Sequence, residues 1–314
     1  MSHAVPATEQ QREAERRPRG AGSNAVLAIV IGVLAGALGL APWWISGAKL
    51  PLQNLWATQV MPDQMPLALL PLSQYEVLTI VALLTTGGAT AGLAVRIWAP
   101  VRRRLTTWCA VLGLLVVHIT ATVQSFSLLD QGLMDGTLAE YYRAGLLAGV
   151  IGSILAAVVA LLLISSRSTV ATTLGCGLMA VPFTSWAVEW VVGAVGHSNV
   201  PIEVSIIAHW IPAIIVGCAL AWCGVKPLGR MAIWVVNLAL LWVIPAVFTA
   251  VQSVLGTRVI AGDIPEMLLM GRQVLTAALG PDGGAVPTVL LALAVGLVGL
   301  GVRIIAARRG PDTA

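Results

Sequence analysis

Charged residues are scarce in this sequence. Only 10% of the 314 residues are Asp, Glu, Lys or Arg, while 58% are apolar, and a soluble globular domain usually carries about 25% charged residues. This shortage excludes an ordinary soluble domain and indicates a polytopic membrane protein. The formal net charge is +4, but the basic residues lie at the ends of apolar runs. Their positions favour membrane orientation, and no nucleic-acid partner is predicted.

Cysteine and catalytic signatures are also sparse. The four cysteines, Cys109, Cys176, Cys218 and Cys223, lie in or beside apolar runs and show no C-x-x-C spacing, so we predict neither a disulfide nor a zinc site. The sequence contains no G-x-S-x-G, H-E-x-x-H, P-loop or G-x-G-x-x-G motif. We therefore predict no catalytic residue, metal or cofactor, and a non-enzymatic role is favoured.

Long apolar runs dominate what is present. Each has the roughly 17–25 residues that a tilted transmembrane helix needs. The runs are Ala25–Ile45, Val77–Val95, Thr107–Leu128, Ala144–Ile164, Leu174–Val195, Val204–Trp222, Met231–Ser253 and Pro287–Ala306. The predicted fold is an all-α bundle of about eight transmembrane helices.

The basic residues predict the orientation of this bundle. With the N-terminal tail inside, most Lys and Arg residues fall in inner segments, as the positive-inside rule requires. Both termini are then cytoplasmic in a plasma membrane. The acids gather at the outer side, where two interpretations stay open: a solvated rim, or a face that attracts cations.

The spans divide the chain into four parts. Residues 1–23 are polar and predict a disordered cytoplasmic tail, and residues 307–314 form the other tail. Residues 24–165 hold the first four spans with a long outer loop over 46–76, and residues 170–306 hold the last four with an outer loop over 254–286. Four prolines interrupt the 46–76 loop, so no long helix can cross it. We expect it at the membrane surface or over the mouth of the bundle.

A faint internal repeat connects the two groups of spans. Val123–Ser125 and Val251–Ser253 both read Val-Gln-Ser, and Glu76-Val77 matches Glu203-Val204 at a similar spacing. These matches suggest two parallel four-helix repeats. The alternative is coincidence, because a small apolar alphabet produces matches easily.

The last outer loop carries a helix signature. Asp263 and Glu266 form a pair like a capping box, with Pro265 in the first turn, and Gly280-Pro281 ends the segment. We predict an amphipathic helix over Ile264–Leu279, lying on the bilayer or on the bundle. Its expected apolar stripe is Ile264, Met267, Leu268, Gly271, Val274, Leu275 and Ala278.

Polar residues deep in a span are the candidates for function. His118 lies near the middle of the third span, and Thr122 and Ser125 share its helical face. One interpretation is a neutral histidine that bonds to a neighbouring helix. The other is a group that carries a proton or contacts a substrate in a cavity.

Glu189 and His209 form a second candidate. They lie in consecutive antiparallel spans at equal distance from the intervening hairpin, which puts both ~9 Å below the outer helix ends. Ser185 lies one turn before Glu189 on the same face. We predict that Glu189 and His209 face each other across a shared, partly hydrated cavity. The alternative is that both reach headgroup water independently.

Three functional classes fit these observations. The leading hypothesis is a transporter, permease or export component with a site between the halves. The second is a non-catalytic scaffold that binds other membrane proteins or a second copy of itself. The third is a membrane-embedded transferase that acts on a lipid-linked substrate at the outer face.

Overall fold

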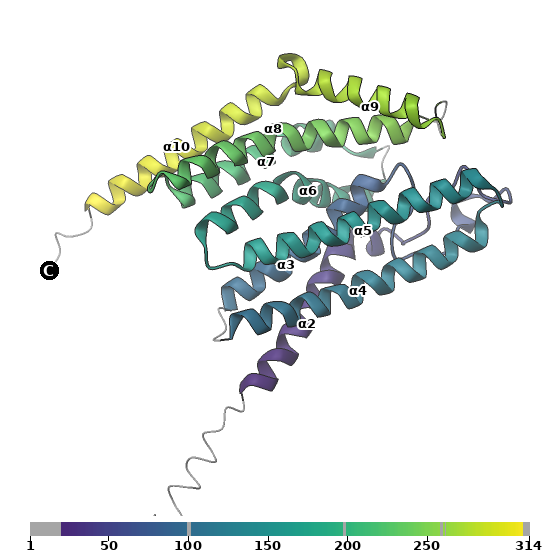
Figure 1. The fold of residues 1–314 in the computed structure, drawn as a ribbon, viewed down its shortest axis with the longest axis horizontal. Coiled ribbons are helices and arrows are strands. Elements are labelled where there is room, and N and C mark those ends of the chain that lie inside the picture. The colour runs from purple at the N-terminus through teal and green to yellow at the C-terminus, as the bar shows by residue number, and fades with distance from the viewer. Residues whose placement is uncertain (1–19, 99–101, 197–198, 258–259, 261, 310–314) are drawn as a thin grey trace, which may run out of the picture.

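Long apolar helices make up the protein, which we describe from a computed structural model over residues 20–98, 102–196, 199–257, 260 and 262–309. In these residues there is no strand, and eight helices are long and apolar enough to cross a membrane. Every predicted span is confirmed and extends past at least one of its predicted ends (Figure 1). The helices are α2 (Gly20–Ile45), α3 (Val77–Trp98), α4 (Arg103–Gly132), α5 (Thr137–Ser165), α6 (Thr169–Val195), α7 (Ile202–Cys223), α8 (Gly229–Gly256), α9 (Ile264–Leu279) and α10 (Ala285–Arg309).

The predicted tails are shorter than expected where they can be compared. Residues 1–19 and 310–314 lie outside the described residues, but residues 20–23 belong to α2 and residues 307–309 to α10. Residues 20–23 are small and uncharged, so nothing in them stops the helix from extending beyond the apolar run.

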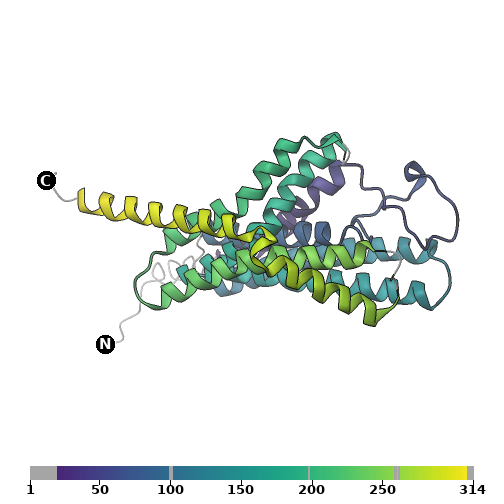
Figure 2. The ribbon, with the colours of Figure 1, turned by 90° about the horizontal axis from the view of Figure 1, so that it is seen from above.

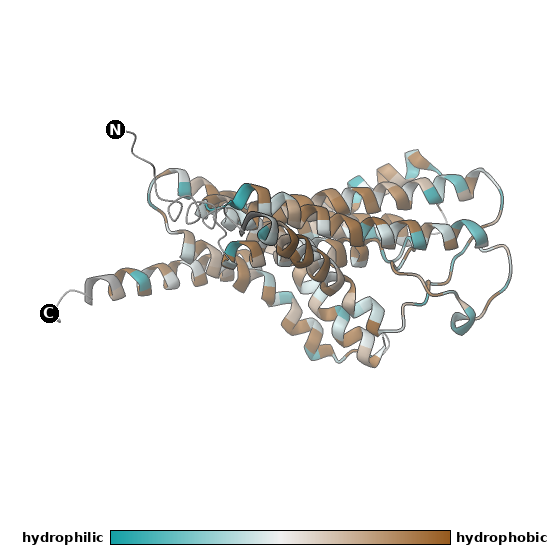
Figure 3. Cartoon of the chain, turned by 90° about the horizontal axis from the view of Figure 1, so that it is seen from below, coloured by the Kyte–Doolittle hydropathy of each residue, from teal (hydrophilic) through white to brown (hydrophobic). Residues whose placement is uncertain are grey.

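Apolar and polar residues separate along the bundle as a membrane requires. Figure 3 shows hydrophobic colour along the middle of the helices and hydrophilic colour mostly towards their ends and in the loops. An even number of spans puts the start of α2 and the end of α10 at the same end of the bundle, and Figure 2 shows the long loop at the opposite end. We refer to the end with the long loop as the outer end, following the predicted orientation.

The two groups of four spans pack in the same order. In the first half α2 packs on α4 and α3 packs on α5; in the second half α6 packs on α8 and α7 packs on α10. The pairs α2–α3 and α6–α7 complete the correspondence. This packing order has the form that the hypothesis of two four-helix repeats predicts.

Glycines allow the helices of the first half to approach closely. A Cβ atom at Gly88 of α3 would lie 2.1 Å from the carbonyl oxygen of Ala157 in α5. A Cβ atom at Gly32 of α2 would lie 2.1 Å from the carbonyl oxygen of Ala110 in α4. Backbone contacts of this kind drive helix association in membranes, where no hydrophobic force acts between helices.

Arg96 links the inner end of α3 to neighbouring helices. Arg96 at the end of α3 donates to the carbonyl oxygen of Ser166 and, at 2.7 Å, to Thr172 Oγ1 of α6. Its guanidinium carbon also lies 5.1 Å from the ring centroid of Trp222 in α7, within cation–π range. Arg96 therefore connects the two halves at this end.

The long outer loop closes the mouth of the first half. Leu50, Leu70 and Leu72 are fully buried there, which decides between the two predicted positions of the loop. Gln124 Oε1 of α4 accepts from the Leu69 amide at 2.9 Å, and Ser125 Oγ accepts from the Leu70 amide at 2.8 Å. The loop is thus a folded cover whose backbone groups bond to the bundle.

The predicted outer helix is confirmed as α9. The Asp263 side chain accepts a hydrogen bond from the Glu266 amide at 3.2 Å, and α9 packs on α8. Part of the expected stripe, including Met267, is half-buried, but Ile264 and Leu268 are exposed. The helix therefore lies on the bundle with part of its apolar surface uncovered.

Replacing Asp263 by alanine should loosen the start of α9. Loss of an N-cap acceptor costs about 0.5–2 kcal/mol of helix stability, so amide hydrogen exchange should accelerate over the first turn of α9 and not over α8. Unchanged exchange in that turn would show that the cap contributes nothing.

The predicted orientation can be tested by labelling single cysteines in a background without the four native ones. Asp135 and Gly283 lie at the outer helix ends, so we expect cysteines there to react with an impermeant reagent added outside intact cells. Arg104 and Lys226 lie at the inner helix ends, so cysteines at these positions should stay protected. Outside labelling at Lys226 would overturn the orientation.

Candidate functional site

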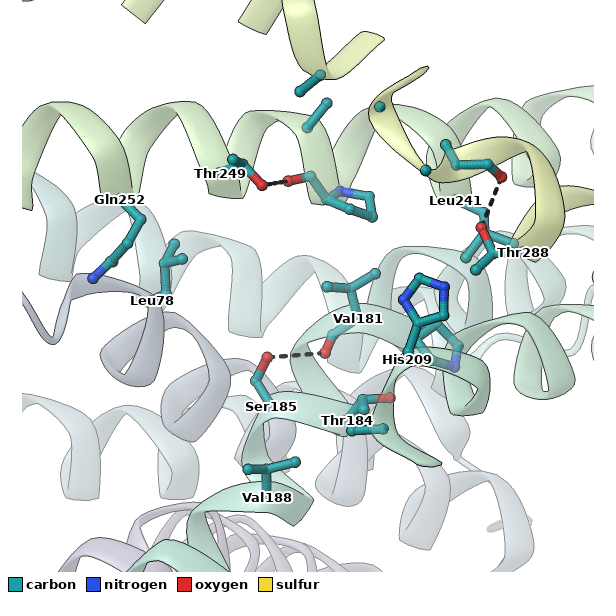
Figure 4. A pocket seen from close by; sticks show the side chains of 18 of the residues that line it. Leu78, Val181, Thr184, Ser185, Val188, His209, Leu241, Thr249, Gln252 and Thr288 are labelled. Carbon is teal, nitrogen blue, oxygen red and sulfur yellow. Dashed lines mark hydrogen bonds between the residues drawn. The ribbon is translucent and has the colours of Figure 1, made fainter. Parts of the chain in front are cut away.

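A cavity of about 800 Å³ lies in the outer part of the bundle (Figure 4). The start of α3 forms one wall, and α6, α7, α8 and the beginning of α10 form the others. Of the described residues of the first half, Tyr75, Glu76, Leu78 and Thr79 line the cavity. The cavity therefore belongs mainly to the second half and is closed by the first helix turn of α3.

Two carboxylates share one hydroxyl group at this wall. Thr79 Oγ1 donates to Glu76 Oε2 at 2.7 Å, and Glu189 Oε1 of α6 lies 3.4 Å from the same oxygen. The two carboxylate oxygens are therefore no more than about 6 Å apart. This wall of the cavity therefore presents two carboxylate side chains, which attract a cation when ionised.

The hydroxyl groups of Thr184, Ser185, Thr249 and Thr288 offer hydrogen-bond acceptors rather than donors to the cavity. Four hydroxyl groups that line it already donate to backbone carbonyl oxygens of their own helix turns, as Figure 4 shows for Ser185 and Thr249. These residues are Thr184, Ser185, Thr249 and Thr288. Their oxygens retain lone pairs for a ligand, but their hydrogens are already used.

Gln252 adds another acceptor. Its Nε2 donates to the carbonyl oxygen of Tyr75 at 3.1 Å, while its Oε1 is buried and accepts no hydrogen bond within the described part of the chain. No Lys or Arg is found among the described residues that line the cavity. The arrangement suits a ligand that carries positive charge or several hydrogen-bond donors.

Three predicted site residues meet in this cavity. Ser185, Glu189 and His209 all line it, and Figure 4 shows the His209 ring directed into the space between α6 and α8. The Trp210 ring packs edge-on against that of His209, with centroids 4.9 Å apart. Glu189 and His209 thus share a cavity, while direct pairing of their charges stays a prediction.

The other three predicted residues lie elsewhere. His118 is fully buried in α4, and neither ring nitrogen has a hydrogen-bond partner among the described residues. The Thr122 hydroxyl donates to the His118 carbonyl oxygen at 2.7 Å, and Ser125 binds the outer loop. None of them lines the cavity, because α4 packs on α2 in the first half.

Sequence reasoning missed Glu76, Thr79 and Gln252. A signal was available for the first two, because a threonine three residues after a glutamate at a helix start can bond to it. Nothing in the local sequence shows that Glu189, separated from Thr79 by 110 positions, reaches the same hydroxyl.

Across the described ranges, no group of three or more His, Cys, Asp and Glu residues could hold a metal ion. Comparison of the chain with protein-family models, with curated proteins and with solved structures gave no match in any of the three. The interpretation of the site therefore depends on its geometry.

Proposed function

We propose that this multi-pass membrane protein is a plasma-membrane permease with both termini cytoplasmic, and that its outer cavity binds a small cationic solute such as an ammonium compound. The observation that carries the proposal is the pair of carboxylates around Thr79 at the wall of a cavity of about 800 Å³. Ionisable groups inside a membrane bundle are costly and commonly mark a substrate or ion path.

The chemistry of the lining supports this class of solute. An ammonium group carries several donors and no acceptor, and Glu76, Glu189 and Gln252 line the cavity. An anion would meet two carboxylates and no Lys or Arg among the described lining residues, and His209 is the basic side chain present there. The carboxylates of Glu76 and Glu189 should therefore favour the binding of cations over anions.

Flux into proteoliposomes tests the proposal. The purified full-length protein is reconstituted and offered radiolabelled methylammonium, putrescine and guanidinium, with glutamate as the anionic comparison. We expect saturable uptake of at least one cation and none of glutamate above protein-free vesicles. Uptake of no cation, or uptake of glutamate alone, would overturn the proposal.

A scaffold is the second candidate, and the exposure of α10 favours it. Val298 and Val302 are more than 60% exposed, and Figure 1 shows the inner part of α10 extending away from the other helices. Such a helix offers packing surface to a partner helix. If this is the function, Val298→Ala with Val302→Ala should lose co-purified membrane proteins, while Glu189→Gln should retain them.

A further inference from the structure

A pocket of about 670 Å³ at the inner end of the bundle is lined mainly by arginines. It lies where α4 begins and α5 passes into α6, and four of its lining residues are basic. We call it the arginine pocket; its residues are Arg102, Arg103, Arg104, Leu105, Trp108 and Arg167. It shares no residue with the outer cavity.

The guanidinium group of Arg103 lacks a counter-charge in this pocket. Its Nε and Nη2 atoms are buried and make no hydrogen bond within the described residues. Arg102, Arg104 and Arg167 line the same pocket, and no acid is found among the described residues that line it. The positive-inside rule alone requires arginines in contact with water, so buried donors without an acceptor need another explanation.

The backbone at this place also favours an anion. Arg102 precedes α4, and its side chain makes no cap to the first-turn amides. The start of a long helix carries a partial positive charge. Four arginines and the N-terminus of α4 thus lie at the same pocket, where one anionic group can interact with the positive charge of both.

Apolar side chains extend the same pocket towards the bilayer. Leu105 is 46% exposed and Trp108 is 54% exposed, and both lie in the first turns of a membrane-spanning helix. A free phosphate ion would not use this surface, whereas a phospholipid presents a phosphate next to acyl chains. Basic pockets between transmembrane helices on the cytoplasmic side bind such headgroups.

We propose that the arginine pocket binds an anionic phospholipid, with the phosphate on the guanidinium groups of Arg103 and Arg167 and the glycerol and acyl region against Leu105 and Trp108. This site does not depend on the proposed transport function. It attaches the ends of α4 and α5 to the inner leaflet.

Native mass spectrometry of the full-length protein tests this site. The protein is exchanged into detergent containing phosphatidylglycerol, cardiolipin or phosphatidylcholine, and retained lipid is counted. We expect the wild type to retain phosphatidylglycerol or cardiolipin and not phosphatidylcholine. Arg103→Gln with Arg167→Gln should weaken that retention by roughly tenfold or more, given the contribution of each basic residue near an anionic surface.

Two further variants keep the test decisive. Lys226→Gln removes an exposed charge that does not line the pocket, and it should retain lipid like the wild type. Arg102→Gln with Arg167→Gln changes only exposed side chains, so it should fold even if loss of Arg103 does not, and it should also lose lipid.

Inorganic phosphate and glycerol-1-phosphate test whether the pocket binds a soluble anion instead of a phospholipid. We expect neither to raise the melting temperature of the protein at millimolar concentration, and Trp108→Ala to lower lipid retention. Equal retention in all arginine variants and Lys226→Gln would overturn the proposal in favour of diffuse surface charge. Stabilisation by phosphate with no retained phospholipid would overturn it in favour of a soluble anion.

Discussion

Glu189→Gln is expected to reduce cation uptake into proteoliposomes to the level of protein-free vesicles while the protein still inserts and accumulates normally. The substitution preserves the shape of the side chain but removes the charge that faces Thr79 and the cavity. Hydrogen bonds to charged groups contribute about 1.5–3 kcal/mol, so binding of the cation should weaken by roughly 10–100-fold.

Glu203→Gln is the matched control for this variant. Glu203 lies in the first turn of α7 and is exposed, and it does not line the cavity. Uptake by Glu203→Gln should equal that of the wild type. Full uptake by Glu189→Gln would remove Glu189 from the substrate site, and an equal loss in both variants would point to general outer-surface charge.

Gly88→Val is expected to prevent α3 from packing on α5 and to abolish the folded protein. A Cβ atom at Gly88 would lie 2.1 Å from the carbonyl oxygen of Ala157 and 2.9 Å from its Cα, so no side-chain rotation relieves the clash. Overpacking usually costs about 1–3 kcal/mol and more when the backbone must move. The yield of monodisperse protein and its melting temperature should both fall sharply.

Gly152→Val on α5 is the control that distinguishes a loss of helix packing from a change in helix propensity. A Cβ atom at Gly152 meets nothing within 4 Å, so the same substitution there should leave the melting temperature nearly unchanged. If the two variants have the same melting temperature, α3 and α5 do not pack as closely as described.

Hydropathy alone was sufficient to predict the number and type of the membrane helices. Most of their ends were placed too far inward, although those at Ile45, Val77 and Val195 were correct. For example, α4 runs over Arg103–Gly132, but the predicted span covered only Thr107–Leu128. Helices continue into the headgroup region, where polar residues are tolerated and the hydropathy signal disappears. The ends of α9 were predicted correctly because Asp263 and Gly280 are local signals.

The outer loop shows what local sequence does not contain. Its prolines predicted a broken segment, but not that Leu70 and Leu72 are fully buried. That burial depends on Gln124 and Ser125, which bind the loop from α4 across 55 positions of sequence. Contacts between residues so far apart in the sequence depend on how all the helices pack, and no periodic pattern in the sequence predicts them.

Two residues that the sequence singled out by their depth in a span lie together in the structure, and their role in a functional site stays a prediction. Counting from the α6–α7 hairpin gave Glu189 and His209, and both line one cavity. The prediction that grouped His118 with Thr122 and Ser125 used helical spacing correctly, yet spacing does not say which helix lies opposite. In the structure α4 packs on α2 and α3, with the His118 ring beside Gly87 of α3, so His118 is enclosed in the first half.

Thiol labelling inside the cavity tests the central claim most directly. In a chain without the native cysteines, Ser185→Cys lines the cavity, whereas Ile214→Cys lies on α7, 47% exposed and outside it. If the cavity is a hydrated cation site open to the outer side, an impermeant cationic methanethiosulfonate reagent added outside should modify Ser185→Cys and not Ile214→Cys, and a transported cation should slow the reaction. A Ser185→Cys thiol as unreactive as that of Ile214→Cys would contradict the account.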